Sequence, residues 1–182
     1  PNLNTDHREQ IELLRKVRAV PGVRHAFIAS GLRFDLAMKD LNYLKELITH
    51  HVGGHLKIAP EHSDEEVLSY MRKPSFKLFE QFREIFEEYS QDAGKEQYLV
   101  PYFISSFPGT TVEKMKILEQ WLQQEKWNLQ QVQNFIPLPM SLAAAMFWSE
   151  LDPSGKHKIA IPKNEGERHA QRKALQPYRF RK

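Results

Sequence analysis

The stretch Tyr98-Leu-Val-Pro-Tyr-Phe-Ile-Ser-Ser-Phe-Pro-Gly-Thr-Thr111 carries the signals of a buried strand, a tight turn and the start of a helix. Residues 98–106 are mostly apolar, with β-branched and aromatic side chains, which is typical of a strand inside a sheet. Pro108-Gly109 predicts a tight turn, and Thr110 or Thr111 can cap a helix through about Trp127. The stretch therefore predicts a strand–turn–helix unit.

Similar signals alternate on both sides of this unit. Apolar residues at helical spacing indicate helices, and short apolar runs that end at Gly or Pro indicate strands. The aromatic stripe that precedes Tyr98 has helical spacing, so we expect it to pack in the core. The other expected elements are helices over residues 7–20, 63–72, 76–89, 40–52 and 141–148, and strands over residues 25–30, 55–59 and 132–137.

Four strands separated by helices predict an α/β fold. Spacings of roughly 30–45 residues imply parallel strands joined by right-handed crossovers. The sheet is then either a doubly wound layer or part of a barrel. In both cases functional groups gather at the C-terminal ends of the strands. This rule selects four segments: Ser30-Gly-Leu-Arg33, Pro60-Glu-His62, Ser105-Ser-Phe-Pro-Gly109 and Pro137-Leu-Pro139.

Composition excludes several classes of site. The 182 residues include no cysteine, so disulfides, thiol catalysis and cysteine-ligated metals are excluded within them. The histidines show no metal-like spacing, and we expect no metal site. No apolar run approaches the ~18–20 residues that span a bilayer, so we expect no membrane contact and a cytoplasmic location. The chain begins with Pro1, and we expect the true start to lie upstream.

The C-terminal segment is basic. Residues 156–182 contain nine lysines and arginines against Glu165 and Glu167. Such a run is more often a solvated helix face than a ligand site, and we favour that reading. Contact with nucleic acid is the alternative. We predict one domain over residues 1–150 and a basic extension over residues 151–182.

Two of the selected strand ends carry chemistry of their own. Glu61 beside His62 puts a carboxylate next to an imidazole, which can bind ribose hydroxyls, orient an amine or carry protons. Arg72 follows eleven residues after Glu61 and can hold a carboxylate through two hydrogen bonds. Small residues in the Ser105–Gly109 turn let a ligand approach the backbone. Taken singly, these residues are equally typical of helix caps, surface pairs and turns.

Together these segments resemble a known family. The combination of Lys57-Ile-Ala-Pro-Glu-His62, Met71-Arg-Lys-Pro74, Pro101-Tyr-Phe-Ile-Ser-Ser106 and Gln133-Asn-Phe-Ile-Pro-Leu-Pro-Met140 is similar to the YgiQ-type radical S-adenosylmethionine (SAM) proteins. The resemblance runs from about residue 5 to the end of the chain. It implies the C-terminal half of a TIM-like (β/α) barrel with about four parallel strands.

The resemblance also implies binding roles. Glu61, with His62 beside it, stands where relatives have a glutamine that hydrogen-bonds the SAM ribose. Arg72 or its neighbour Lys73 stands where a basic residue holds the SAM carboxylate. Tyr102 stands where many relatives carry an aspartate for the ribose, which puts that contact in doubt. The remaining implied residues are Ser105 and Ser106 near the adenosine, Ile136 to Leu138 with Pro137 at the adenine, and Ser30 and Arg33 toward the substrate or the methionyl group.

The implied function is radical chemistry on an unidentified substrate. Members of the family bind a 4Fe–4S cluster on a Cys-x3-Cys-x2-Cys loop, and the reduced cluster cleaves SAM to a 5′-deoxyadenosyl radical. Because these residues contain no cysteine, we expect the cluster loop on a missing N-terminal part and an inactive fragment without catalytic residues. The alternative is a cluster-free binding module associated with RNA. A complete non-radical α/β enzyme would need a nucleophile–base pair, which we do not find.

An isolated half-barrel would also expose the edge of its first strand. That edge lies around Phe27 and Ile28, and unpaired strand edges favour pairing with other chains. We therefore expect poor solubility or self-association of this segment.

Overall fold

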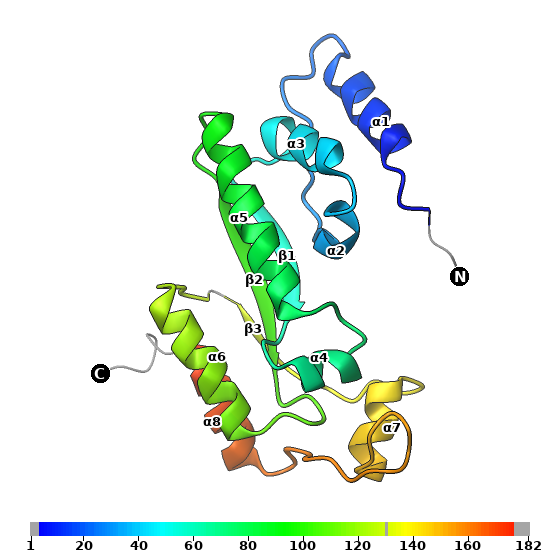
Figure 1. The fold of residues 1–182 in the computed structure, drawn as a ribbon, viewed down its shortest axis with the longest axis vertical. Coiled ribbons are helices and arrows are strands. Elements are labelled where there is room, and N and C mark those ends of the chain that lie inside the picture. Colours follow the sequence, from blue (N-terminus) through cyan, green and yellow to red (C-terminus); the bar gives the residue numbers. More distant parts are fainter. Residues whose placement is uncertain (1–3, 130, 177–182) are drawn as a thin grey trace. The chain divides into compact units, whose positions relative to one another are not determined.

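The computed structural model describes residues 4–129 and 131–176, and Figure 1 shows the order of their elements. No helix in this part of the chain is both long and apolar enough to cross a bilayer. The helices are α1 (Arg8–Arg18), α2 (Phe34–Ala37), α3 (Leu41–His50), α4 (Glu65–Tyr70), α5 (Phe76–Asp92), α6 (Val112–Gln124), α7 (Leu142–Ser149) and α8 (Glu165–Ala174). The strands are β1 (His55–Glu61), β2 (Tyr98–Ser105) and β3 (Val132–Asn134).

The strands form one sheet in the order β1-β2-β3. Strands β2 and β3 are parallel, with Phe103 opposite Val132 and Ser105 opposite Asn134. Since helices separate the strands along the chain, the predicted α/β class is confirmed. The sheet is consistent with part of a barrel. Among the described residues it has three strands and not the predicted four.

The strand predicted over residues 25–30 is wrong. Near it, the structure has only an isolated parallel bridge between Leu32 and Ile58. The carbonyl of Ala26 is 2.7 Å from Nδ1 of the buried His51 ring. The His51 side chain therefore takes the hydrogen bond that this carbonyl would accept from a neighbouring strand. Phe27 in the same segment is about half exposed, and burial contributes little to fixing a strand there.

The described residues fall into two compact units. The first contains residues 4–59 and 77–100, and the second contains residues 60–76, 101–129 and 131–176. In the first unit the aromatic stripe of α5 is buried, as predicted, and Phe34 packs its ring against Phe79 and Phe82. Also in this unit, the buried carboxylate of Glu46 pairs with two arginines of α1.

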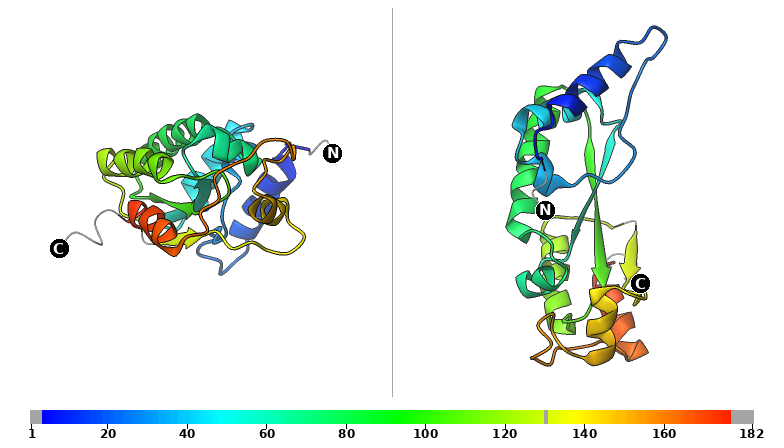
Figure 2. Two further views of the ribbon diagram at one scale, coloured as in Figure 1. Left: turned by 90° about the horizontal axis from the view of Figure 1, so that it is seen from below. Right: turned by 90° about the vertical axis from the view of Figure 1, so that its right-hand side faces the viewer.

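The second unit contains the strand ends selected by the sequence. Its core includes Val67, Phe107, Phe135, Met146 and Phe147. Helices α6 and α8 lie side by side in it (Figure 2), and α8 also contacts β3. The described part of the predicted basic extension, residues 151–176, lies within this unit. The proposed boundary at residue 150 stays a prediction.

Two helix caps lie at the expected helix starts. Asp64 accepts a hydrogen bond from the Val67 N–H at the start of α4, and Thr111 accepts one from the Lys114 N–H at the start of α6. Several boundaries differ from the prediction. Strand β3 ends at Asn134 and not at residue 137, and α5 continues to Asp92. Strand β1 continues through Pro60 to Glu61, and α6 ends at Gln124.

Candidate functional site

A groove runs along the strand ends of the second unit. It consists of two adjoining hollows that share Ile104, Phe107 and Ala143, and we call the whole the strand-end groove. The first hollow, of about 290 Å³, is completed by Glu61, Tyr70, Met71, Arg72, Lys73 and Leu142. The second, of about 660 Å³, is completed by Val132, Gln133, Asn134, Phe135, Ile136, Leu138, Ser141 and Arg172.

The first hollow carries charged groups on an apolar background. Lys73 Nζ lies 3.1 Å from Glu61 Oε1. Arg72 is exposed, and its guanidinium has no ion pair or hydrogen bond within residues 4–129 and 131–176. A carboxylate and a free guanidinium in one hollow can take the ammonium and the carboxylate of an amino acid, respectively.

Unusual backbone conformations occur at three of the sequence-predicted residues. The φ angles of Glu61, Arg72 and Ser106 are 68°, 55° and 63°. Side chains other than glycine at such positions cost about 1–2 kcal/mol. Strained residues of this kind cluster at binding and catalytic sites, and they also occur where a helix ends, as at Glu150 of this chain. The strain therefore supports a binding role for this end of the sheet.

Local hydrogen bonds account for two of these conformations. The His62 N–H donates to the Pro60 carbonyl at 2.9 Å, which closes a three-residue turn around Glu61. Arg72 directly follows the last residues of α4, and the Lys73 N–H donates back to the Leu68 carbonyl at 2.9 Å. Glycine usually occupies that position after a helix. Here the chain places an arginine side chain there instead.

The second hollow is lined by hydrogen-bond donors and exposed apolar side chains. Ser105 Oγ donates to Asn134 Oδ1 at 2.5 Å, which leaves the Asn134 NH₂ group as a donor. Gln133 and Arg172 are exposed, and Ile136 and Leu138 are 68% and 65% exposed. This hollow can take a flat or apolar body beside a group that accepts hydrogen bonds.

Helix α8 supports the turn that follows β2. The Ser106 N–H donates to Gln171 Oε1 at 2.9 Å, and Gln171 Nε2 donates to the Thr110 carbonyl at 3.2 Å. All three residues are buried. The turn also needs glycine at 109, since a methyl group there would come within 2.7 Å of the Tyr70 ring. The sequence did not single out Gln171, because only its contacts distinguish it from a solvated helix residue.

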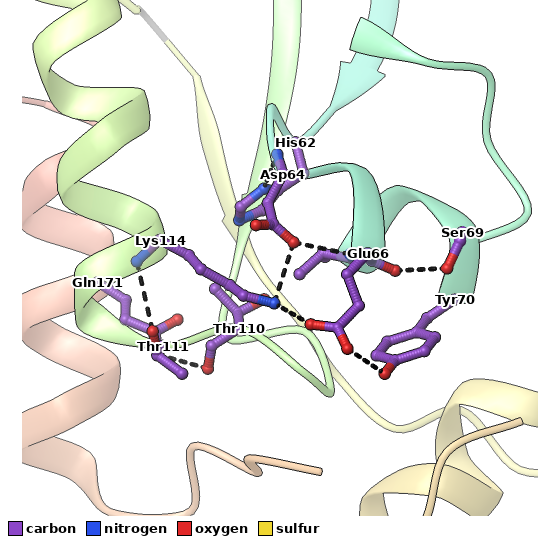
Figure 3. A network of polar contacts seen from close by, with 10 residues as sticks. His62, Asp64, Glu66, Ser69, Tyr70, Thr110, Thr111, Lys114 and Gln171 are labelled. Atoms are coloured by element: carbon purple, nitrogen blue, oxygen red, sulfur yellow. Dashed lines mark hydrogen bonds and ion pairs between the residues drawn. The ribbon is translucent and has the colours of Figure 1, made fainter.

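A polar network links α4 to α6 beside the groove (Figure 3). Lys114 Nζ lies 3.0 Å from Asp64 Oδ1 and 2.6 Å from Glu66 Oε2, and the Tyr70 hydroxyl donates to Glu66 Oε1 at 2.8 Å. The Lys114 hydrogen bond lowers the pKa of Glu66. Burial and the hydrogen bond to Glu66 raise the pKa of Tyr70 to about 12. The network thus holds a neutral Tyr70 at the wall of the first hollow.

His62 belongs to the buried part of this region and not to the groove lining. Its side chain is fully buried, and its Nδ1 accepts the Asp64 N–H at 2.9 Å. Burial lowers the pKa of His62 to about 4, so the ring is neutral near pH 7. Burial alone would raise the pKa of Asp64, but the Val67 N–H and Lys114 hold it below its usual range.

The other predicted site residues lie in different places. Ser105 and Ser106 are buried and line neither hollow. Tyr102 is half-buried and lines neither hollow. Pro137 lines a neighbouring shallow hollow of about 600 Å³ together with Met140 and Trp148.

Ser30 and Arg33 belong to the first unit. There the Arg33 guanidinium donates two hydrogen bonds to Asp35, at 2.8 and 2.6 Å. In the described part of the chain no three metal-ligating side chains come together.

Comparison with known proteins identifies UPF0313 proteins as relatives of the chain. No family model matches the chain. It is 49% identical over 182 residues to a UPF0313 protein of Shewanella oneidensis, 50% over 173 residues to one of Pseudomonas syringae, and 53% over 155 residues to one of Pseudomonas aeruginosa. These matches cover 97%, 92% and 85% of the chain but 23%, 22% and 21% of the relatives. The chain thus spans less than a quarter of their length.

Proposed function

We propose that the chain is one part of a YgiQ-type radical SAM enzyme, the class in which we place the UPF0313 relatives, and that its strand-end groove binds part of SAM. The observation that supports this most is the first hollow, where Glu61 and an unpaired Arg72 lie together at the strand ends. Ligands of α/β folds bind at this edge of a sheet.

The groove matches the chemistry of SAM at both ends. The amino-acid end of SAM has an ammonium and a carboxylate, for which Glu61 and Arg72 are suitable partners. Lys73 already pairs with Glu61, so Arg72 is the better of the two candidate bases for the carboxylate. The adenosine would lie against the shared apolar residues, toward the backbone of residues 136–138.

The chemistry itself would come from the remainder of the longer protein. When bound, a 4Fe–4S cluster supplies the electron that cleaves SAM, and its cysteine ligands are absent from these 182 residues. The contribution of this chain is to bind and orient the cofactor and to shield it from water. We expect no turnover from the chain alone. The three-stranded sheet would then be a piece of the enzyme barrel.

Binding of S-adenosylhomocysteine, the stable analogue of SAM, tests this proposal. We expect calorimetry or ligand-observed NMR to detect binding to the 182-residue chain, and Arg72→Gln to weaken it about tenfold, the loss of one charge-assisted hydrogen bond. Lys173→Gln removes the same charge from an exposed position of α8 that lines neither hollow, and should leave the affinity unchanged. Absence of binding, or equal effects of the two variants, would refute the proposal.

A further inference from the structure

The proposed cofactor leaves one charge of the groove unexplained. Arg172 of α8 lines the second hollow, is exposed, and has no ion pair or side-chain hydrogen bond among the residues that the structure describes. No acidic side chain of the described residues lines that hollow. The charges of SAM lie at its amino-acid and sulfonium end, while adenine is neutral near pH 7. Arg172 therefore has no partner in the proposed cofactor.

Neighbouring contacts fix Arg172 in this place. Gln171, the preceding residue, is buried and binds the turn after β2. Arg168, one helical turn earlier, donates to the Phe135 carbonyl at 3.0 Å. Helix α8 is thus bound to the residues that follow β2 and β3, and the base of the Arg172 side chain cannot move away from the hollow without breaking these hydrogen bonds.

The rest of this hollow also presents donors. Asn134 directs its amide oxygen to Ser105 and keeps its NH₂ group available, and Gln133 is exposed on the same strand. A guanidinium beside two amides is a set of groups that binds carboxylates and phosphates. Val132, a half-buried residue of β3 that lines the same hollow, can contact an apolar or planar part of the same ligand.

We propose that Arg172, with Gln133 and Asn134, forms a subsite for an oxyanion of the substrate at the β3 end of the strand-end groove. The inference rests on the proposed function, because the proposed position of SAM makes Arg172 available to a second molecule. The substrate is then a carboxylic acid or a phosphate ester with an apolar or planar body.

The test uses inorganic phosphate and acetate as probes, with side-chain NMR signals of the 182-residue chain as the readout. We expect the probes to shift the Arg172 Nε–H signal and the amide signals of Gln133 and Asn134. Arg172→Gln should weaken the amide response about fivefold, the range for an exposed ion pair, and Arg172→Lys should restore part of it. A stronger response to phosphate assigns a phosphate ester, and a stronger response to acetate assigns a carboxylic acid.

Two controls keep this test separate from the proposed function. Lys173→Gln removes the same charge from the next residue and should leave the amide responses unchanged. If it acts like Arg172→Gln, an adventitious ion only has been observed, and if the amides do not respond, no ion binds there. Either result overturns the inference. Failure of S-adenosylhomocysteine to bind the unmodified chain would instead refute the proposed function, while a response lost only in Arg172→Gln would still support the oxyanion subsite.

Discussion

Acid should weaken the second unit through His62. Burial lowers the pKa of this ring from 6.5 to about 4, so the folded protein keeps it neutral where the unfolded chain would protonate it. Between these two values the unfolded state binds more protons, and the free energy of unfolding falls as the pH falls. Each pKa unit corresponds to about 1.4 kcal/mol, so the full loss of stability amounts to about 3 kcal/mol. Nearly all of this loss has occurred once the pH reaches 4.

Tryptophan fluorescence during urea unfolding measures this effect, because Trp121, Trp127 and Trp148 all lie in the second unit. The contribution of His62 should lower the free energy of unfolding by about 3 kcal/mol between pH 7 and pH 4. His62→Asn keeps an acceptor for the Asp64 N–H but has no proton to gain, so it should remove most of that slope.

Several other carboxylates and histidines also titrate on acidification, so the comparison between variants decides the question. His157 is exposed, and His157→Asn should keep the slope of the unmodified chain. The reasoning would be refuted by an NMR titration that gives the His62 ring a pKa near 6.5, or by an unchanged slope in His62→Asn.

Three further predictions follow from the same contacts. Gln171→Met should cost about 2–4 kcal/mol of stability, because it leaves the buried backbone groups of residues 106 and 110 unpaired without a large change in volume. The same change at the exposed Gln120 should cost under ~0.5 kcal/mol. Equal losses of stability in urea unfolding would contradict the role assigned to Gln171. Arg72→Gly should be about 1 kcal/mol more stable than Arg72→Ala, because φ is 55° there; thermal unfolding that ranks alanine higher would show that the position is unstrained. Sedimentation should show self-association that Trp148→Lys reduces, since Trp148 and Met140 are 72% and 106% exposed; a monomer at high concentration would contradict this.

The local sequence pattern predicted those elements that depend on residues close to one another in the chain. The α5 stripe has helical period over several turns, so its burial could be foreseen without knowing its partners. The caps Asp64 and Thr111 depend on an N–H only three residues away. Strand β2 has an uninterrupted apolar run, which suffices for a buried strand.

The misjudged features depend on distant contacts. The 25–30 segment reads as a short strand, but its pairing depends on whether a partner strand or the His51 ring, 25 residues from Ala26, takes the carbonyl. Gln171 lies in a basic helix and would be read as solvated, yet it binds a turn 65 residues earlier. Both contacts join residues that are far apart in the sequence, so the spacing of neighbouring residues could not predict them.

The positive φ angles at the strand ends serve two different purposes. Glu61 and Arg72 have positive φ angles and line the first hollow, so a ligand in that hollow would contact their side chains. Ser106 is fully buried and lines neither hollow, so its side chain offers nothing to a ligand. Its φ angle of 63° lies at the end of β2, directly before Phe107 in the wall that both hollows share, and its N–H donates to Gln171. Ser106→Gly should therefore leave ligand affinity intact, whereas glycine at residue 61 or 72 should weaken it. Calorimetry with S-adenosylhomocysteine separates the two cases, and an equal loss of affinity in all three variants would show that the bend, not the side chains, makes the site.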